Sequence, residues 1–199
     1  MKISKIKLTL ALMGLLTSAS AQERMDLSKA KHYAQITRQN TEQFKHAPLS
    51  FEADIEQPVA LANDSFGGLL IPRARLSEGS SEDVGTEPVA IGELWLYNLT
   101  LERNGWPMRE HTLDIIPLNT EEGRVRIPRC VLAVSKPSGK PPLLMVYGKS
   151  KTPLFTVNLT EREPFQEMPL DMSADESGNA TVHILGKYHA RFKVAELYL

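Results

Sequence analysis

The chain has 199 residues, of which 24% are charged, with a formal net charge of −1. Its only cysteine, Cys130, excludes an intrachain disulfide, so the fold must depend on its hydrophobic core. Because no basic run stands out along the chain, the electrostatic signature of a nucleic-acid-binding protein is missing and we expect no nucleic-acid partner.

The first 21 residues have the three zones of a secretory signal peptide. Three lysines in the first seven residues precede an apolar run at residues 8–16, and small residues ending at Ala21 give the cleavage site. The apolar run is too short to span a bilayer, which needs about 20 such residues. We therefore predict cleavage after Ala21, export to the periplasm or the extracellular space, and no transmembrane segment in the mature chain.

Residues 22–47 are predicted to form an N-terminal helix or arm. Asp26 can cap a helix over residues 26–45, because its carboxylate accepts hydrogen bonds from the free N–H groups of the first turn. The stripe that this helix could bury is thin, which indicates a weakly docked helix or a mobile arm. The stripe consists of Leu27, Ala30, Ala34, Thr37, Thr41 and Phe44.

From residue 48 the period of the apolar residues changes from helical to two, which predicts a single β domain over residues 48–199. Leu49, Phe51, Ala53 and Ile55 alternate with polar residues, as expected of a half-buried strand. A further strand is expected over residues 68–72. Residues 78–87 are acidic and rich in Ser and Gly, which is typical of a flexible loop.

Short strands follow one another from Pro88 onward. Connections such as Asn104-Gly105 are too short for parallel crossovers, so neighbouring strands should be antiparallel. This spacing predicts an all-β fold, an antiparallel β-sandwich, and leaves an Ig-like and a jelly-roll-like strand order both open. The expected strands cover residues 95–101, 112–118, 124–128, 130–134, 143–147, 154–159 and 180–194.

The alternation predicts several details of these strands. In one continuous strand, Trp95 and Tyr97 would share a face with Leu99 and Leu101. At Pro128 the apolar residues change from odd to even positions, which favours a bulge or a break. A two-residue turn at Gly186-Lys187 would pair residues of opposite faces, so we expect one long strand bent at Gly186.

Few residues suggest a metal or cofactor, and we expect no cofactor. Asp171, Asp175 and Asn179 occupy alternating positions in an acidic turn, which is the pattern of a weak calcium site. A plain solvated hairpin turn is the alternative interpretation. His183 and His189 should not share a metal, because a bent strand separates them and a hairpin turn at Gly186-Lys187 would place them on opposite faces.

The sequence contains no complete catalytic motif, so no catalytic residue is proposed from it. Gly148-Lys149-Ser150 lacks the glycine that a phosphate-binding loop needs five residues earlier, where Leu143 stands, and it is interpreted as a hairpin turn. Cys130 shares a face with Leu132 and Val134, so we expect a buried apolar role.

Three aromatic residues are candidates for ligand binding: Trp95, Tyr97 and Trp106. Core packing is the alternative role of the first two, whereas Trp106 follows a turn and is expected to be exposed. The sequence thus favours a non-enzymatic binding or structural module of the cell envelope, with a protein or glycan ligand. The alternative is a secreted or periplasmic hydrolase whose site is assembled from residues distant in sequence.

Overall fold

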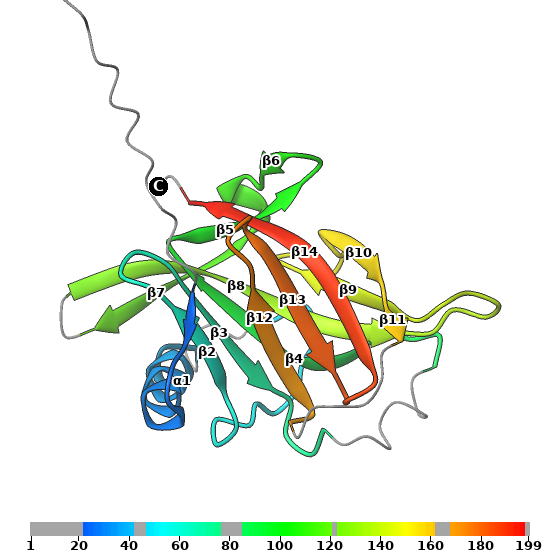
Figure 1. Cartoon of the computed structure of the whole chain (residues 1–199), viewed down its shortest axis with the longest axis horizontal. Helices are drawn as coiled ribbons and strands as arrows, with labels where there is room; N and C mark the ends of the chain where they lie inside the picture. Colours follow the sequence, from blue (N-terminus) through cyan, green and yellow to red (C-terminus); the bar gives the residue numbers. More distant parts are fainter. Residues whose placement is uncertain (1–21, 42–46, 77–84, 121–122, 162–167, 198–199) are drawn as a thin grey trace, which may run out of the picture.

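The computed structural model describes residues 22–41, 47–76, 85–120, 123–161 and 168–197, which form two antiparallel sheets and one α-helix (Figure 1). The predicted all-β sandwich with an N-terminal helix is confirmed. The first sheet has the order β1 (Glu23–Arg24), β2 (Val59–Ala62), β3 (Gly67–Pro72), β4 (Val89–Tyr97), β8 (Gly123–Ser135), β9 (Leu143–Tyr147) and β10 (Phe155–Asn158), and β7 (Asp114–Thr120) also pairs with β8. The second has the order β12 (Leu170–Ala174), β13 (Asn179–Ile184), β14 (Tyr188–Glu196), β5 (Leu99–Arg103) and β6 (Trp106–Pro107), and β11 (Thr160–Glu161) pairs with β14.

The main core lies between the two sheets. Leu70, Leu94 and Leu132 from the first sheet and Leu101 and Ile184 from the second are buried there in one apolar cluster. Cys130 belongs to the same cluster and is fully buried, as its alternation with Leu132 and Val134 predicts.

The outer face of the first sheet is also covered, by the helix α1 (Leu27–Thr41) and by the segment at residues 47–57 (Figure 1). Ala30 and Ala34 of α1 are buried against the sheet, and small residues let the helix approach closely. The predicted cap is present, because the Asp26 carboxylate accepts a hydrogen bond from the Lys29 N–H at 3.0 Å. The predicted end of the helix at residue 45 lies outside the described residues.

The segment over residues 49–56 is not a strand, which corrects the sequence prediction. Its backbone forms only one isolated bridge, between Ala53 and Arg73. Leu49 and Phe51 nevertheless pack on the outer face of the first sheet. Alternation here reports one buried face of an extended chain rather than membership of a sheet.

The continuous strand expected over residues 95–101 is interrupted at Asn98, whose φ of 54° lies in the left-handed region. The chain passes there from β4 in the first sheet to β5 in the second. Trp95 consequently packs on the outer face of the first sheet, whereas Leu99 and Leu101 enter the core between the sheets. The prediction of one shared face was wrong.

Strand β8 runs without a break through Pro128, so the expected bulge or break at this residue is absent. The register with β7 is continuous, with Pro128 opposite Ile115 and Arg129 opposite Asp114. Val125 and Ile127 pack on the outer face beneath α1, whereas Cys130 enters the inner core. The parity changes because different faces of one regular strand are buried along its length; the register shift lies in β4, between Ala90 and Gly92.

Residues 180–194 form a hairpin, β13–β14, rather than one bent strand. The loop has three residues, 185–187, and Leu185 and Gly186 both have positive φ, 54° and 67°. Val182 therefore faces Ala190 and Ile184 faces Tyr188, which keeps the even-numbered residues on one face. The prediction failed because it assumed a loop one residue shorter. Most of the predicted acidic loop at 78–87 lies outside the described residues.

Candidate functional site

A half-open cavity of about 380 Å³ lies between α1 and the outer face of the first sheet. Its floor is formed by the outward-facing side chains of the sheet, such as Leu69, Leu118 and Ile127. The helix forms its wall with Tyr33 and Ile36. The thin apolar stripe of α1 explains the cavity, because small residues meet the sheet along one line and leave space beside it.

Aromatic rings are concentrated at this cavity. Trp95 is 2% exposed, whereas Tyr33 and Tyr97 are 45% and 43% exposed. Phe66 contributes a further ring from the β2–β3 turn, where the Asn63 side-chain oxygen accepts hydrogen bonds from the N–H groups of Ser65 and Phe66 at 3.0 and 2.8 Å. The cavity thus offers a buried indole and two accessible phenol rings.

Two of the three predicted ligand-binding aromatics, Trp95 and Tyr97, therefore line one cavity. Trp106 does not line it and is 76% exposed on β6, in the second sheet, as its position after a turn predicts. Sequence reasoning missed Tyr33, Ile36 and Phe66. The two helix residues lie beside the predicted stripe, but only docking of the helix shows that they face a cavity.

The described residues that line the cavity include no Asp, Glu, Lys or Arg. Their polar groups come from His32, Thr37, Asn63, Thr120 and the two tyrosines. An apolar cavity with a few convergent polar groups is typical of a binding site. Since a buried charge needs a partner, this cavity suits an uncharged group.

A buried charge cluster lies on the same outer face as Trp95. The Arg129 guanidinium donates two hydrogen bonds to Asp114 Oδ2, at 2.8 and 2.5 Å, and its central carbon lies 5.8 Å from the Trp95 ring centroid. Burial raises the pKa of Glu93, and Asp114 adds to this increase, whereas Trp95 and Arg129 oppose it. The Trp95 indole lowers the pKa of Glu93, although its Nε1 makes no hydrogen bond of normal length and angle within the described residues. None of these three charged residues lines the cavity.

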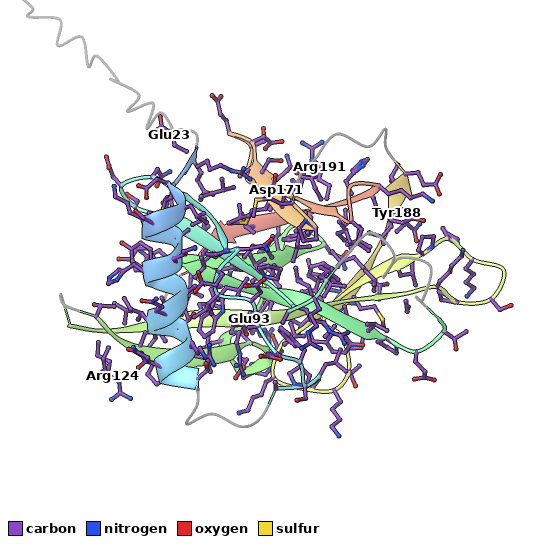
Figure 2. All side chains as sticks on the ribbon, turned by 90° about the horizontal axis from the view of Figure 1, so that it is seen from below. Glu23, Glu93, Arg124, Asp171, Tyr188 and Arg191 are labelled. Carbon is purple, nitrogen blue, oxygen red and sulfur yellow. The ribbon has the colours of Figure 1, made fainter. Side chains whose placement is uncertain are left out.

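The predicted calcium ligands are only partly brought together. The Asp175 carboxylate accepts hydrogen bonds from the N–H groups of Ser177 and Asn179 and from the Asn179 side-chain amide, and it pairs with Arg191. The Asn179 hydrogen bonds and the Arg191 guanidinium lower the pKa of Asp175 to about 2. Asp171 instead pairs with Arg24. Figure 2 shows Asp171 and Arg191 on the side of the molecule opposite Glu93.

Within the described ranges, no group of three or more His, Cys, Asp or Glu side chains is arranged to hold a metal ion. The calcium site stays a prediction, and each of its two carboxylates already has a guanidinium partner.

The structure brings His183 and His189 together as directly opposed residues of β13 and β14. The prediction that a hairpin would turn them to opposite faces was wrong, since the three-residue loop changes the register. Ser173 Oγ lies 3.1 Å from His183 Nε2, so a serine and two imidazoles gather on the outer face of the second sheet.

The thiol of Cys130 is not a candidate nucleophile. Burial raises its pKa to about 12, so it stays protonated at neutral pH, and no part of the residue reaches solvent.

In the part of the chain that the structure describes, no helix has the length and apolar character needed to cross a bilayer. Comparison with known proteins finds no family model, no curated protein and no solved structure that matches the chain. Function is therefore inferred from the geometry of the chain itself.

Proposed function

We propose that this protein is a non-enzymatic binding module whose ligand inserts an uncharged apolar group into the cavity between α1 and the first sheet. The observation that carries the proposal is the absence of charged side chains among the described residues around an aromatic cavity of about 380 Å³. This volume is near the lower end of the range of ligand sites, about 300–1,000 Å³. The cavity therefore suits one side chain or one small ring system.

Of the two ligand classes expected from the sequence, protein and glycan, the cavity favours a protein partner. Its floor consists of aliphatic side chains and the Trp95 ring, which offer little hydrogen bonding to sugar hydroxyls. An aromatic or large aliphatic side chain in such a pocket is the usual anchor of a protein interface. Tyr33 and Tyr97 at the mouth could then contact the backbone of the partner with their hydroxyls.

The glycine Gly67 allows a test that leaves the cavity walls in place. A Cβ atom at Gly67 would meet Tyr97 Cβ at 3.7 Å and Ala62 Cβ at 3.7 Å, on the outer face, so Gly67→Leu should occupy the cavity. The matched control is Gly68→Ala, whose methyl group would contact Met172 at 3.6 Å on the opposite face. Indole is a suitable probe, and its binding is measured by NMR from the signal of the Trp95 indole N–H.

Indole should bind the wild-type chain and Gly68→Ala alike, and at least about tenfold more weakly to Gly67→Leu, because the leucine takes its place. Proteins captured from envelope extract should be retained by the first two and lost from the third. Equal capture by all three chains would contradict the proposal. Binding of a chito-oligosaccharide, with no response to indole, would show that the cavity binds a glycan rather than a protein.

A hydrolase is the second candidate function, and the contact between Ser173 and His183 supports it. A serine hydroxyl 3.1 Å from an imidazole nitrogen is within reach of proton transfer, and Ser173 is exposed. Asp171 lies opposite His183 in the register, but its carboxylate is engaged by Arg24 and by the Met172 N–H. Covalent labelling of Ser173 by a fluorophosphonate, lost in Ser173→Ala, would support this candidate; an unlabelled native protein would exclude Ser173 as the nucleophile of a hydrolase.

Export to the periplasm or the extracellular space is part of the same proposal and is supported by the basic, apolar and small-residue zones of residues 1–21. Intact mass measurement of the protein from cell fractions tests it. A mature chain starting at Gln22 in the envelope or the medium is the expected result, and a cytoplasmic chain that retains Met1 would contradict it.

A further inference from the structure

We propose that one end of the molecule docks on the anionic headgroups of a phospholipid bilayer. The surface, here called the cationic tip, comprises Trp106 with Arg103 and Arg109 from the β5–β6 hairpin and its continuation, and Lys149 and Lys151 from the β9–β10 loop. It is separate from the cavity, because none of these residues lines it. The proposal therefore does not depend on the proposed function.

The hairpin presents Trp106 to solvent. Asn104 and Gly105 have φ values of 55° and 81°, which produce the tight turn between β5 and β6. The hairpin projects from the body of the molecule at the top of Figure 1. Trp106 is 76% exposed, the most exposed of the large hydrophobic side chains that the structure describes. Exposure of a tryptophan at a projecting turn costs hydration free energy that docking recovers.

The two segments of the tip are held together by one side-chain-to-backbone and one backbone hydrogen bond. Arg103 Nη1 donates to the Leu154 carbonyl at 3.0 Å, and the Lys149 N–H donates to the Thr112 carbonyl at 3.3 Å. A Cβ atom at Gly148 would lie 2.5 Å from that Thr112 oxygen, so this close approach requires glycine. Segments more than 35 residues apart in the chain thus form one surface, and the sequence shows no basic run there.

The positive charge of the tip is not neutralised within the described residues. Among the described residues, Arg103, Arg109, Lys149 and Lys151 form no ion pair with a carboxylate. The acid closest in sequence to Arg109, Glu110, is already paired with Arg126. A chain with a net charge of −1 therefore presents a local excess of cations around an exposed indole.

A bilayer fits this combination better than a soluble polyanion does. Tryptophan is enriched at the headgroup level of membranes, where one part of the ring is in an apolar and the other in a polar environment. Lysines and arginines beside it are attracted by the surface potential of anionic lipids. A soluble polyanion would account for the cations alone.

Vesicles of phosphatidylcholine, with or without about one quarter phosphatidylglycerol, test the proposal at low salt. The mature chain should sediment with the anionic vesicles only, and it should dissociate at high salt because screening weakens surface attraction. Trp106 emission should shift to shorter wavelength on binding, while the buried Trp95 contributes a constant background. The shift should disappear in Trp106→Phe.

The charge variants give the quantitative result. Each cation near an anionic surface contributes about a fivefold increase in affinity, so Lys149→Ser with Lys151→Ser should weaken vesicle binding roughly 25-fold. The matched control is Lys136→Ser with Lys140→Ser, which removes two exposed lysines of the β8–β9 loop, at the opposite end of β9 from Lys149 and Lys151. Circular dichroism verifies that each variant is folded.

Two results would overturn the proposal. The first is that the wild-type chain does not bind anionic vesicles, or that the variant without the two lysines binds them as tightly as the wild type. The second is retention on dextran sulfate without any binding to vesicles, which would assign the tip to a soluble polyanion instead.

Discussion

Replacement of Arg129 by methionine tests whether the buried ion pair supports the first sheet beneath Trp95. The Arg129 side chain is 6% exposed and donates both of its short hydrogen bonds to Asp114, whose side chain is 17% exposed. Methionine preserves most of the apolar stem of the arginine and removes only its charged group. Asp114 is then left without its cation in a largely buried position.

The expected loss in the free energy of unfolding is about 3 kcal/mol. Removing one partner of a buried ion pair costs about 3–5 kcal/mol, because the remaining charge is desolvated without compensation. The lower end applies here, since Asp114 keeps part of its surface in water. The exposed pair of Lys31 and Glu56 gives the matched control, because Glu56→Gln should change stability by no more than about 1 kcal/mol.

Urea denaturation followed by circular dichroism measures these differences, and an unchanged m-value shows that the variant unfolds as the parent does. The double variant Arg129→Met with Asp114→Leu removes both charges and should recover most of the lost stability. A single variant that loses less than about 1 kcal/mol, or a double variant no more stable than the single one, would refute the reasoning.

The remaining predictions concern Glu93, Asp175, Cys130 and Gly92. Because burial raises the folded pKa of Glu93, ionisation of Glu93 destabilises the fold at neutral pH; Glu93→Gln should be more stable than the wild type at pH 7, with the difference vanishing below the ordinary pKa near 4.5, and urea denaturation over this range decides it. Asp175 has a lowered pKa, so the stability it contributes should be complete above pH 3.8 and lost as the pH falls towards about 2, and Asp175→Ser should abolish this dependence of the melting temperature. The Cys130 thiol, with a pKa of about 12, should resist a thiol reagent such as dithiobisnitrobenzoate until denaturant is added, and rapid labelling of the native protein would contradict its burial. Gly92→Ala would place a Cβ atom 2.6 Å from the Ile71 carbonyl and 2.8 Å from Leu170 Cδ2, so thermal unfolding should show a loss of about 1–3 kcal/mol.

Several local features of the fold could be predicted from the sequence alone, because interactions among neighbouring residues determine them. The Asp26 cap and the Asn104-Gly105 turn depend on hydrogen bonds and backbone conformations within a few residues, and both are present. The strand expected over residues 154–159 is present as β10, where exposed Thr156 and Asn158 alternate with half-buried Phe155 and Val157. Such signals are reliable because neighbouring residues alone satisfy them.

The sequence did not reveal which layer covers each face. Val125 and Ile127 pack under α1, whereas Cys130 packs against the second sheet, although all three belong to one regular strand. Periodicity reports that a face is buried but not which element buries it. The prediction for residues 185–187 was wrong for a related reason. Two positive φ values in a three-residue loop set the register of the hairpin, and Leu185 gives no strong local signal of such a loop.

Both candidate surfaces were decided by tertiary structure. Trp95 and Tyr97 could be named from the sequence, but the cavity exists only because α1 meets the sheet through Ala30 and Ala34 and leaves Tyr33 beside a gap. The cationic tip likewise forms where two segments distant in the chain are joined by hydrogen bonds, one from the Arg103 side chain and one from the Lys149 N–H. Local sequence sets the conformation of short segments, whereas a site depends on which segments packing brings together, and that depends on long-range contacts.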